Sequence, residues 1–166
     1  MERMIRMGEL AISSTPGDVL VSLGLGSCIG LALIDRRAGA AGLAHIVLPE
    51  ATGSPAPASL HKFADHAVPA LFDGMRERGA SRVFMEAVLV GGASMFASAG
   101  MEVGLRNAEA VRSLVAARRV PVVAEAVGGS RGRTIRVDVA GGGVTVREAG
   151  GSDELLYAPA GTAVAA

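Results

Sequence analysis

Apolar residues in the first third of the chain form short runs separated by turn-forming glycines. Residues 19–23 and 29–34 are two such runs, and the glycines of LGLGSC between them permit a tight turn. A third run, residues 43–48, ends at Pro49. The pattern predicts two adjacent strands joined by a turn that carries Cys28, followed by a third strand.

Two later segments show the apolar period of a helix. The stripe from Leu60 to Met75 follows i, i+3, i+4, i+7 spacing, so we expect a helix with Ser59 as its N-cap, a kink at Pro69 and an end at Gly79. A second stripe, from Leu105 to Val115, predicts another helix. Residues 51–58 are rich in Pro, Gly and Ser and predict a loop, and residues 82–90 and 120–127 predict strands.

The last third of the chain contains a strand pattern and a tail. Apolar and polar residues alternate over 134–139 and again over 144–146, which predicts a hairpin with one face in water. After Gly150 small residues prevail, and no face can bury much area. We therefore expect one domain, residues 1–149, and a poorly ordered tail, residues 150–166.

Composition narrows the classes of function. The 166 residues are half apolar but only 3% aromatic, so small aliphatic side chains must fill the core. The formal charge is zero and the arginines are scattered, which argues against nucleic acid as a partner. No stretch approaches the roughly 18 apolar residues of a membrane span, and the N-terminus has no apolar signal core, so we expect a cytoplasmic protein without membrane insertion.

The single cysteine, Cys28, cannot form an internal disulfide and makes a poor zinc site. It is either a small buried hydrophobe or a reactive thiol. The pairs Gly91–Gly92 and Gly128–Gly129 lack the spacing of a phosphate-binding loop. We therefore expect neither a cofactor nor a metal.

Ser22, Cys28 and His45 fall on the predicted strands and on the turn between them. A thiol attacks an amide carbonyl as the thiolate, and an imidazole can take its proton and later return it to the departing amine. The Ser22 hydroxyl can fix the imidazole tautomer, as an Asp or Asn does in other triads. Backbone N–H groups around Gly26, Ser27 and Cys28 could hold the developing oxyanion.

These residues also allow other interpretations. A lone cysteine and a lone histidine beside apolar strands are often structural, and Cys28 could instead be a redox-sensing thiol.

Several motifs indicate a family. VSLGLGSCIGLALID and AAGLAHIVLP, which lie within residues 20–49, closely resemble the N-terminal signature of the CheD chemoreceptor glutamine deamidases. VGGASMF at 90–96, GLRNAEAV at 104–111, PVVAEAVGG at 121–129 and GRTIRVD at 132–138 follow in the family's order, so the resemblance covers roughly residues 8–148.

The resemblance implies a compact α/β layered fold, and the predicted elements make it a single-domain layered sandwich of mostly antiparallel or mixed strands with two main helices. It implies hydrolysis of glutamine side chains on the chemoreceptor cytoplasmic domain through a thioester, with Cys28 as nucleophile and His45 as base. A CheC-type phosphatase is a further implied partner. The alternative function is a non-catalytic module that docks on the receptor or on that phosphatase.

Three positions carry specific expectations. The family's third catalytic position is typically threonine, so Ser22 is expected to orient His45 more loosely and to lower the rate. Gly91 and Gly92 are candidates for shaping a substrate groove near Cys28. Arg131 and Arg133 could steer acidic receptor helices, although we favour a solvated hairpin edge for both.

Overall fold

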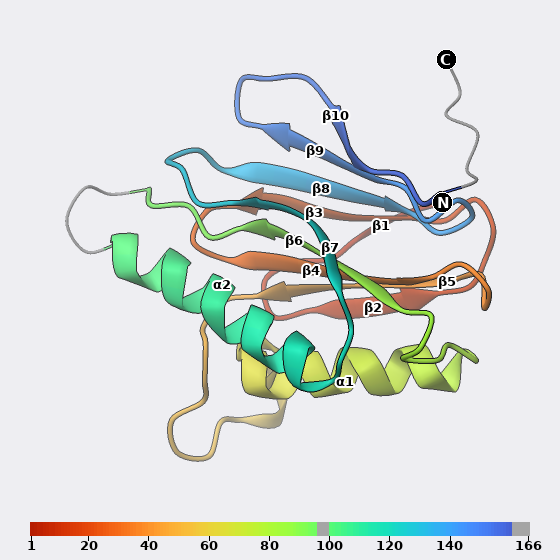
Figure 1. The fold of residues 1–166 in the computed structure, drawn as a ribbon. Helices are drawn as coiled ribbons and strands as arrows, with labels where there is room; N and C mark the ends of the chain where they lie inside the picture. The colour runs from red at the N-terminus through yellow and green to blue at the C-terminus, as the bar shows by residue number, and fades with distance from the viewer. Residues whose placement is uncertain (96–99, 161–166) are drawn as a thin grey trace.

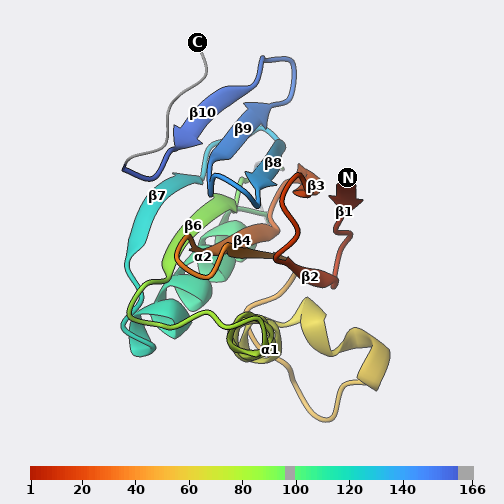
Figure 2. The same ribbon diagram turned by 90° about the vertical axis from the view of Figure 1, so that its right-hand side faces the viewer.

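The computed structural model describes residues 1–95 and 100–160. In this part of the chain, two five-stranded sheets and two long helices stack in three layers. One sheet lies uppermost in Figure 1, the second lies in the middle, and both helices lie beneath it. Figure 2 shows the same order from the side. The predicted α/β layered sandwich in a single domain is confirmed.

The upper sheet has the strand order β1-β3-β8-β9-β10. β1 pairs in parallel with β3, and the other neighbours pair antiparallel. The strands are β1 (Glu2–Met4), β3 (Val19–Leu25), β8 (Arg133–Asp138), β9 (Val144–Glu148) and β10 (Glu154–Tyr157).

The middle sheet has the order β2-β5-β4-β6-β7. Only its β6–β7 pair is parallel among the described strands. The strands are β2 (Leu10–Ser13), β4 (Ile29–Asp35), β5 (Ala40–Ile46), β6 (Glu86–Gly91) and β7 (Val122–Val127).

The middle sheet is covered on both faces, which explains its continuous apolar runs. In β4, Leu31 and Leu33 pack in the cluster that includes the helices, whereas Ala32 and Ile34 pack in the cluster between the two sheets. Because alternate side chains of a strand point to opposite faces, a strand covered on both sides is apolar at most positions. The seven residues of β4 are accordingly all buried.

The helices are η1 (Pro57–Lys62), a 3-10 helix, and the α-helices α1 (Ala64–Glu77) and α2 (Gly100–Ala117). The predicted buried stripe of α1 is confirmed, and Pro69 lies inside the helix. The predicted N-cap at Ser59 is wrong, because residues 57–62 form η1 and Phe63 precedes α1. Neither α-helix, over the residues described, is long and apolar enough to cross a membrane.

Both chain ends contain strands that the sequence pattern did not predict. The N-terminal segment supplies β1 and β2, one to each sheet. The tail expected from Gly150 onward is wrong for Glu154–Tyr157, because this segment is β10 and pairs with β9. The side chain of Tyr157 also donates a hydrogen bond to Glu86 of β6. Residues 161–166 of that tail lie outside the described residues.

Candidate active site

A β-bulge near the end of β3 turns the chain toward Cys28. Ser22 pairs with Ile135 of β8, but the next pair joins Leu25 to Arg133, so β3 holds one extra residue over this stretch. Gly24 lies within the bulge at φ +65°, a conformation that favours glycine. The pairing of β3 with β8 resumes after the bulge at Leu25, where β3 ends and the chain enters the turn at residues 26–28.

Strand register places Cys28 and His45 on the same face of the middle sheet. His45 of β5 lies opposite Gly30 of β4, and Cys28 precedes Gly30 by two residues. Residues two apart on a strand share a face, and diagonal neighbours on adjacent strands lie about 7–8 Å apart at their Cα atoms. This face is directed at the upper sheet, because Cys28 packs in the cluster between the two sheets and His45 contacts Ser22 of β3.

Ser22 and His45 are joined in a chain of hydrogen bonds. The Ser22 Oγ lies 2.8 Å from the Nδ1 of His45 and 2.7 Å from the carbonyl oxygen of Ile5. A carbonyl oxygen only accepts, so the single hydroxyl proton of Ser22 is donated to Ile5. The His45 Nδ1 must then be the donor to Ser22, which assigns the proton to Nδ1 and leaves a lone pair on Nε2.

The Nε2 atom of His45 is buried and has no hydrogen-bond partner among the described residues. The thiol of Cys28 is therefore not hydrogen-bonded to it in this structure. Such bonds are often absent without substrate and form when the substrate binds. The unpaired lone pair is what a general base requires.

Burial keeps both groups neutral. Cys28 is 8% exposed and His45 is 3% exposed. Burial raises the pKa of the Cys28 thiol, although its own backbone N–H partly offsets the rise. Burial also lowers the pKa of His45, against smaller raising effects of the Ile5 carbonyl and Glu9. The resting pair at neutral pH is therefore a thiol and a neutral imidazole, not an ion pair.

Three successive carbonyl groups of the Cys28 turn are held by the structure around it. The Gly26 oxygen accepts from the backbone N–H of Ala93 at 2.7 Å, and the Cys28 oxygen accepts from Gly92 at 2.9 Å. The Ser27 oxygen accepts from the Nδ2 of Asn107 at 2.9 Å. The turn is thus fixed from two sides, by the segment after β6 and by α2.

The backbone N–H groups of this turn differ in whether they are already hydrogen-bonded. The Gly26 N–H donates to the Gly24 carbonyl at 3.0 Å, so it is engaged within the turn, and its role toward an oxyanion stays a prediction. Over the ranges that the structure describes, the N–H groups of Ser27 and Cys28 donate to no other residue. These two groups remain candidates for holding an oxyanion.

Gly91 and Gly92 lie directly against the Cys28 turn. A Cβ on Gly91 would stand 2.0 Å from the Cys28 carbonyl oxygen, and Gly91 has φ +119°. Only glycine fits this combination of conformation and close approach. Their position beside Cys28 agrees with the sequence prediction, and their contact with a substrate remains a prediction.

Arg133 fixes the same glycine segment from the upper sheet. The prediction of a solvated edge is wrong for Arg133, which is only 8% exposed, whereas Arg131 is exposed. The Nη1 of Arg133 donates to the carbonyl oxygens of Gly128 at 2.6 Å and Gly91 at 3.3 Å, and the Nη2 of Arg133 pairs with Glu148 at 3.0 Å. Arg133 therefore has a structural role beside the turn.

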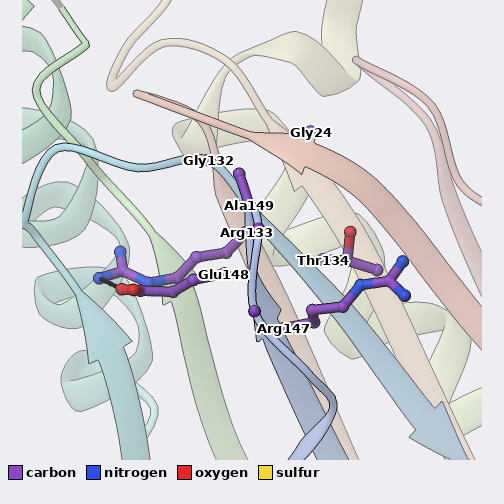
Figure 3. A pocket seen from close by; sticks show the side chains of 9 residues that line it. Gly24, Gly132, Arg133, Thr134, Arg147, Glu148 and Ala149 are labelled. Carbon is purple, nitrogen blue, oxygen red and sulfur yellow. Dashed lines mark hydrogen bonds and ion pairs between the residues drawn. The ribbon is translucent and has the colours of Figure 1, made fainter.

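A hollow of about 430 Å³ lies next to this region, lined by Gly24, by the start of β8 and by the end of β9. Figure 3 shows Arg133 and Glu148 pointing toward one another along one side of it. Cys28 and His45 do not line this hollow.

Sequence reasoning missed two groups of the site. The Ile5 carbonyl lies in a segment without a strand pattern, and backbone groups carry no signal in side-chain identity. Asn107 is polar and has no place in an apolar stripe, yet its side chain is completely buried. The available signal for its burial was its place in the sequence, directly before Ala108 of the helix.

Comparison with known proteins gives a consistent result. The family model described as CheD chemotactic sensory transduction matches residues 47–148. This range begins after Ser22, Cys28 and His45, so the match does not include them.

Curated relatives cover more of the chain. The chemoreceptor glutamine deamidase CheD of Thermotoga maritima is 38% identical over 93% of this chain and 97% of its own. A probable chemoreceptor glutamine deamidase CheD of Clostridium tetani is 40% identical over 90% of this chain and 92% of its own. A solved structure, the Bacillus licheniformis hypothetical protein YfiH, is 15% identical, with a TM-score of 0.46 over 73% of this chain and 49% of that chain.

Proposed function

Because this chain belongs to the CheD family, we propose that it is a chemoreceptor glutamine deamidase in which Cys28 is the nucleophile, His45 the base and Ser22 the residue that orients His45. The substrate is the glutamine side chain of a chemoreceptor, as the names of the relatives indicate, and we place it in the receptor's cytoplasmic domain. A CheC-type phosphatase is a further proposed partner.

The observation that carries this proposal is the hydrogen-bond order Ile5, Ser22, His45. It directs the imidazole proton to Nδ1 and keeps the Nε2 lone pair free on the face shared with Cys28. A merely structural histidine in this position would be expected to pair both nitrogens, since buried polar atoms are nearly always hydrogen-bonded. The unpaired atom therefore supports a role for His45 as a base.

The first half-reaction forms a thioester. As the Cys28 sulfur attacks the Cδ of the glutamine, its proton passes to the Nε2 of His45. The carbonyl oxygen becomes an oxyanion, which the Ser27 and Cys28 N–H groups hold. The tetrahedral intermediate then collapses, the C–N bond breaks, and His45 returns the proton so that the nitrogen leaves as ammonia.

The second half-reaction restores the enzyme. A water molecule loses a proton to His45 and attacks the thioester carbonyl, and the C–S bond breaks as the sulfur takes that proton back. The product is glutamate. The receptor thereby exchanges a neutral amide for a carboxylate, which adds one negative charge per converted site.

Neutral starting groups fit this order of events. A thiol with a raised pKa carries little thiolate at pH 7, so the nucleophile must be generated at the moment of attack. A buried imidazole with a lowered pKa is unprotonated at the same pH and can accept that proton. The reaction therefore depends on His45 more strongly than one that starts from a preformed thiolate.

The test uses the purified chain and a receptor cytoplasmic domain. Mass spectrometry of the receptor should show a gain of about one mass unit per converted glutamine, because an amide NH2 is replaced by OH. Cys28→Ser and His45→Asn should each abolish this gain, whereas Ser13→Ala, a buried change in a hydrogen bond to Asp18, should leave it. An unchanged receptor mass with the wild-type chain, together with stable co-purification of the two proteins, would support the docking alternative.

A further inference from the structure

Asn107 is the polar side chain that links the Cys28 turn to the segment directly after β5, the strand of His45. It lies in α2 and is completely buried. Its Nδ2 donates one proton to the carbonyl oxygen of Ser27 at 2.9 Å and the other to that of Val47 at 2.8 Å. Ser27 precedes Cys28 by one residue, and Val47 follows His45 by two. A single amide group therefore bonds both to the turn that carries Cys28 and to the segment that follows His45.

The bond to Ser27 determines where the Cys28 N–H points. The described part of the chain has no cis peptide bond, and in a trans peptide the C=O and the following N–H point in opposite directions. Since the Ser27 carbonyl is directed at Asn107, the Cys28 N–H is directed away from α2. That N–H donates to no other described residue and lies close enough to its own sulfur to favour the thiolate.

The orientation of the Asn107 amide is also determined. Rotating it by half a turn would set Oδ1 against two carbonyl oxygens, so Nδ2 must face them. Oδ1 is then buried and has no partner among the described residues. Leaving an acceptor unpaired is unfavourable, and such a group calls for an explanation beyond packing. The two donated hydrogen bonds supply that explanation.

We propose that Asn107 is a positioning residue of the deamidase: by holding the carbonyl groups of Ser27 and Val47, it aims the Cys28 N–H at the oxyanion of the reacting glutamine. This inference rests on the proposed deamidase function. It assigns to Asn107 an effect on the transition state, exerted through the peptide plane that it fixes.

Two reactions of the same sulfur separate this role from general support of the fold. Deamidation develops an oxyanion, whereas alkylation by iodoacetamide forms a C–S bond and breaks a C–I bond without one. In Asn107→Asp, both donors are replaced by an acceptor of the same shape, and the peptide loses its tether. We expect kcat for receptor deamidation to fall about 10- to 100-fold, below the loss from deleting an oxyanion donor outright.

In the same variant we expect the KM to change less than about threefold and the rate of Cys28 alkylation to fall by much less than kcat, because alkylation loses only the smaller effect of the Cys28 N–H on the thiol pKa, whereas deamidation also loses an oxyanion donor. Asn107→Gln keeps both donors on an arm one methylene longer, so it should lower kcat by less and show the same contrast with alkylation. Asn107→Gln also tests the inference if Asn107→Asp does not fold. Ser13→Ala is the matched control for a lost buried hydrogen bond away from the site.

Parallel losses of deamidation and alkylation would overturn the inference, as would a kcat in both variants equal to that of Ser13→Ala. If Cys28 of the wild-type chain is alkylated by iodoacetamide but the chain deamidates no receptor, the proposed function is instead refuted. The two failures are therefore distinguishable.

Discussion

The Ser22 hydroxyl lies 2.8 Å from the Nδ1 of His45 while its own proton is committed to the Ile5 carbonyl at 2.7 Å. Two hydrogen bonds thus hold an oxygen whose side chain has no β-branch. The expectation that serine orients His45 more loosely than threonine was based on χ1 freedom alone. In the folded chain, the hydrogen bonds and complete burial restrict that torsion.

Two substitutions of Ser22 separate the effect of its hydroxyl on kcat from the effect of a β-branch. Ser22→Ala leaves the Nδ1–H of His45 without its Ser22 acceptor, so we expect kcat to fall about 10- to 100-fold and the free energy of unfolding to fall by about 1–3 kcal/mol. Ser22→Thr keeps the hydroxyl and should change kcat less than about threefold. Deamidation assays and urea unfolding test both. A large gain in kcat for Ser22→Thr would show that serine does limit the rate.

The pH dependence of stability should report the buried imidazole. Burial lowers the pKa of His45 below the usual value of 6.5, so between the two values the unfolded chain binds more protons than the folded chain. The free energy of unfolding should therefore fall as the pH decreases from 6.5 to the folded pKa, and level off below it. His45→Asn can still donate to Ser22 but does not titrate.

Thermal unfolding of the wild type and of His45→Asn between about pH 5 and 8 measures this difference. The two proteins share all other residues, so the difference between their curves isolates His45. The acid limb of kcat/KM for deamidation should likewise lie below the ordinary histidine range, because it reports the free enzyme's base. Parallel unfolding curves for the two proteins would contradict the lowered pKa.

Gly91→Ala should disrupt the nucleophile turn. Its new Cβ would stand 2.0 Å from the Cys28 carbonyl, at φ +119°. We expect a loss of about 3 kcal/mol or more in the free energy of unfolding, and a large loss of deamidation. Gly17→Ala is the matched control, since Gly17 has φ +91° but nothing within 4 Å, and should cost only about 1–2 kcal/mol. Equal losses would mean that close approach at Gly91 has no effect.

Arg133→Met should leave the Gly128 carbonyl unpaired beside the site. The oxygens of Gly91 and Gly128 both lose a charged donor, but the Gly91 oxygen keeps its hydrogen bond from the Gly128 N–H, and Glu148 is half exposed and is solvated by water. We expect a loss of about 2–4 kcal/mol in the free energy of unfolding. Arg131→Met, at the exposed neighbour, should stay within about 0.5 kcal/mol. Chemical denaturation of both variants measures the contrast, and similar values would remove Arg133 from its structural role.

Much of the fold could be predicted from local patterns. The strands that flank Cys28 and both α-helices were predicted close to their observed positions, because apolar periodicity reflects which face of an element is buried. β1 and β2 were missed, since short strands with charged or mixed residues have no such period. β10 was missed for a related reason: its four residues show no regular apolar period, and the strand is held by pairing with β9, by the packing of Leu156 and Tyr157 against the core and by the Tyr157 hydrogen bond to Glu86.

The sequence by itself determined the chemistry on offer: one thiol, an imidazole and a hydroxyl, carried on segments whose periodicity makes them strands. Only the tertiary structure decided how these groups are used. It brings the Ile5 carbonyl to Ser22 and so selects the His45 tautomer, and it buries Asn107 between Ser27 and Val47. These contacts join residues distant in the chain through backbone groups, which every residue carries alike, so no pattern of side chains could have revealed them.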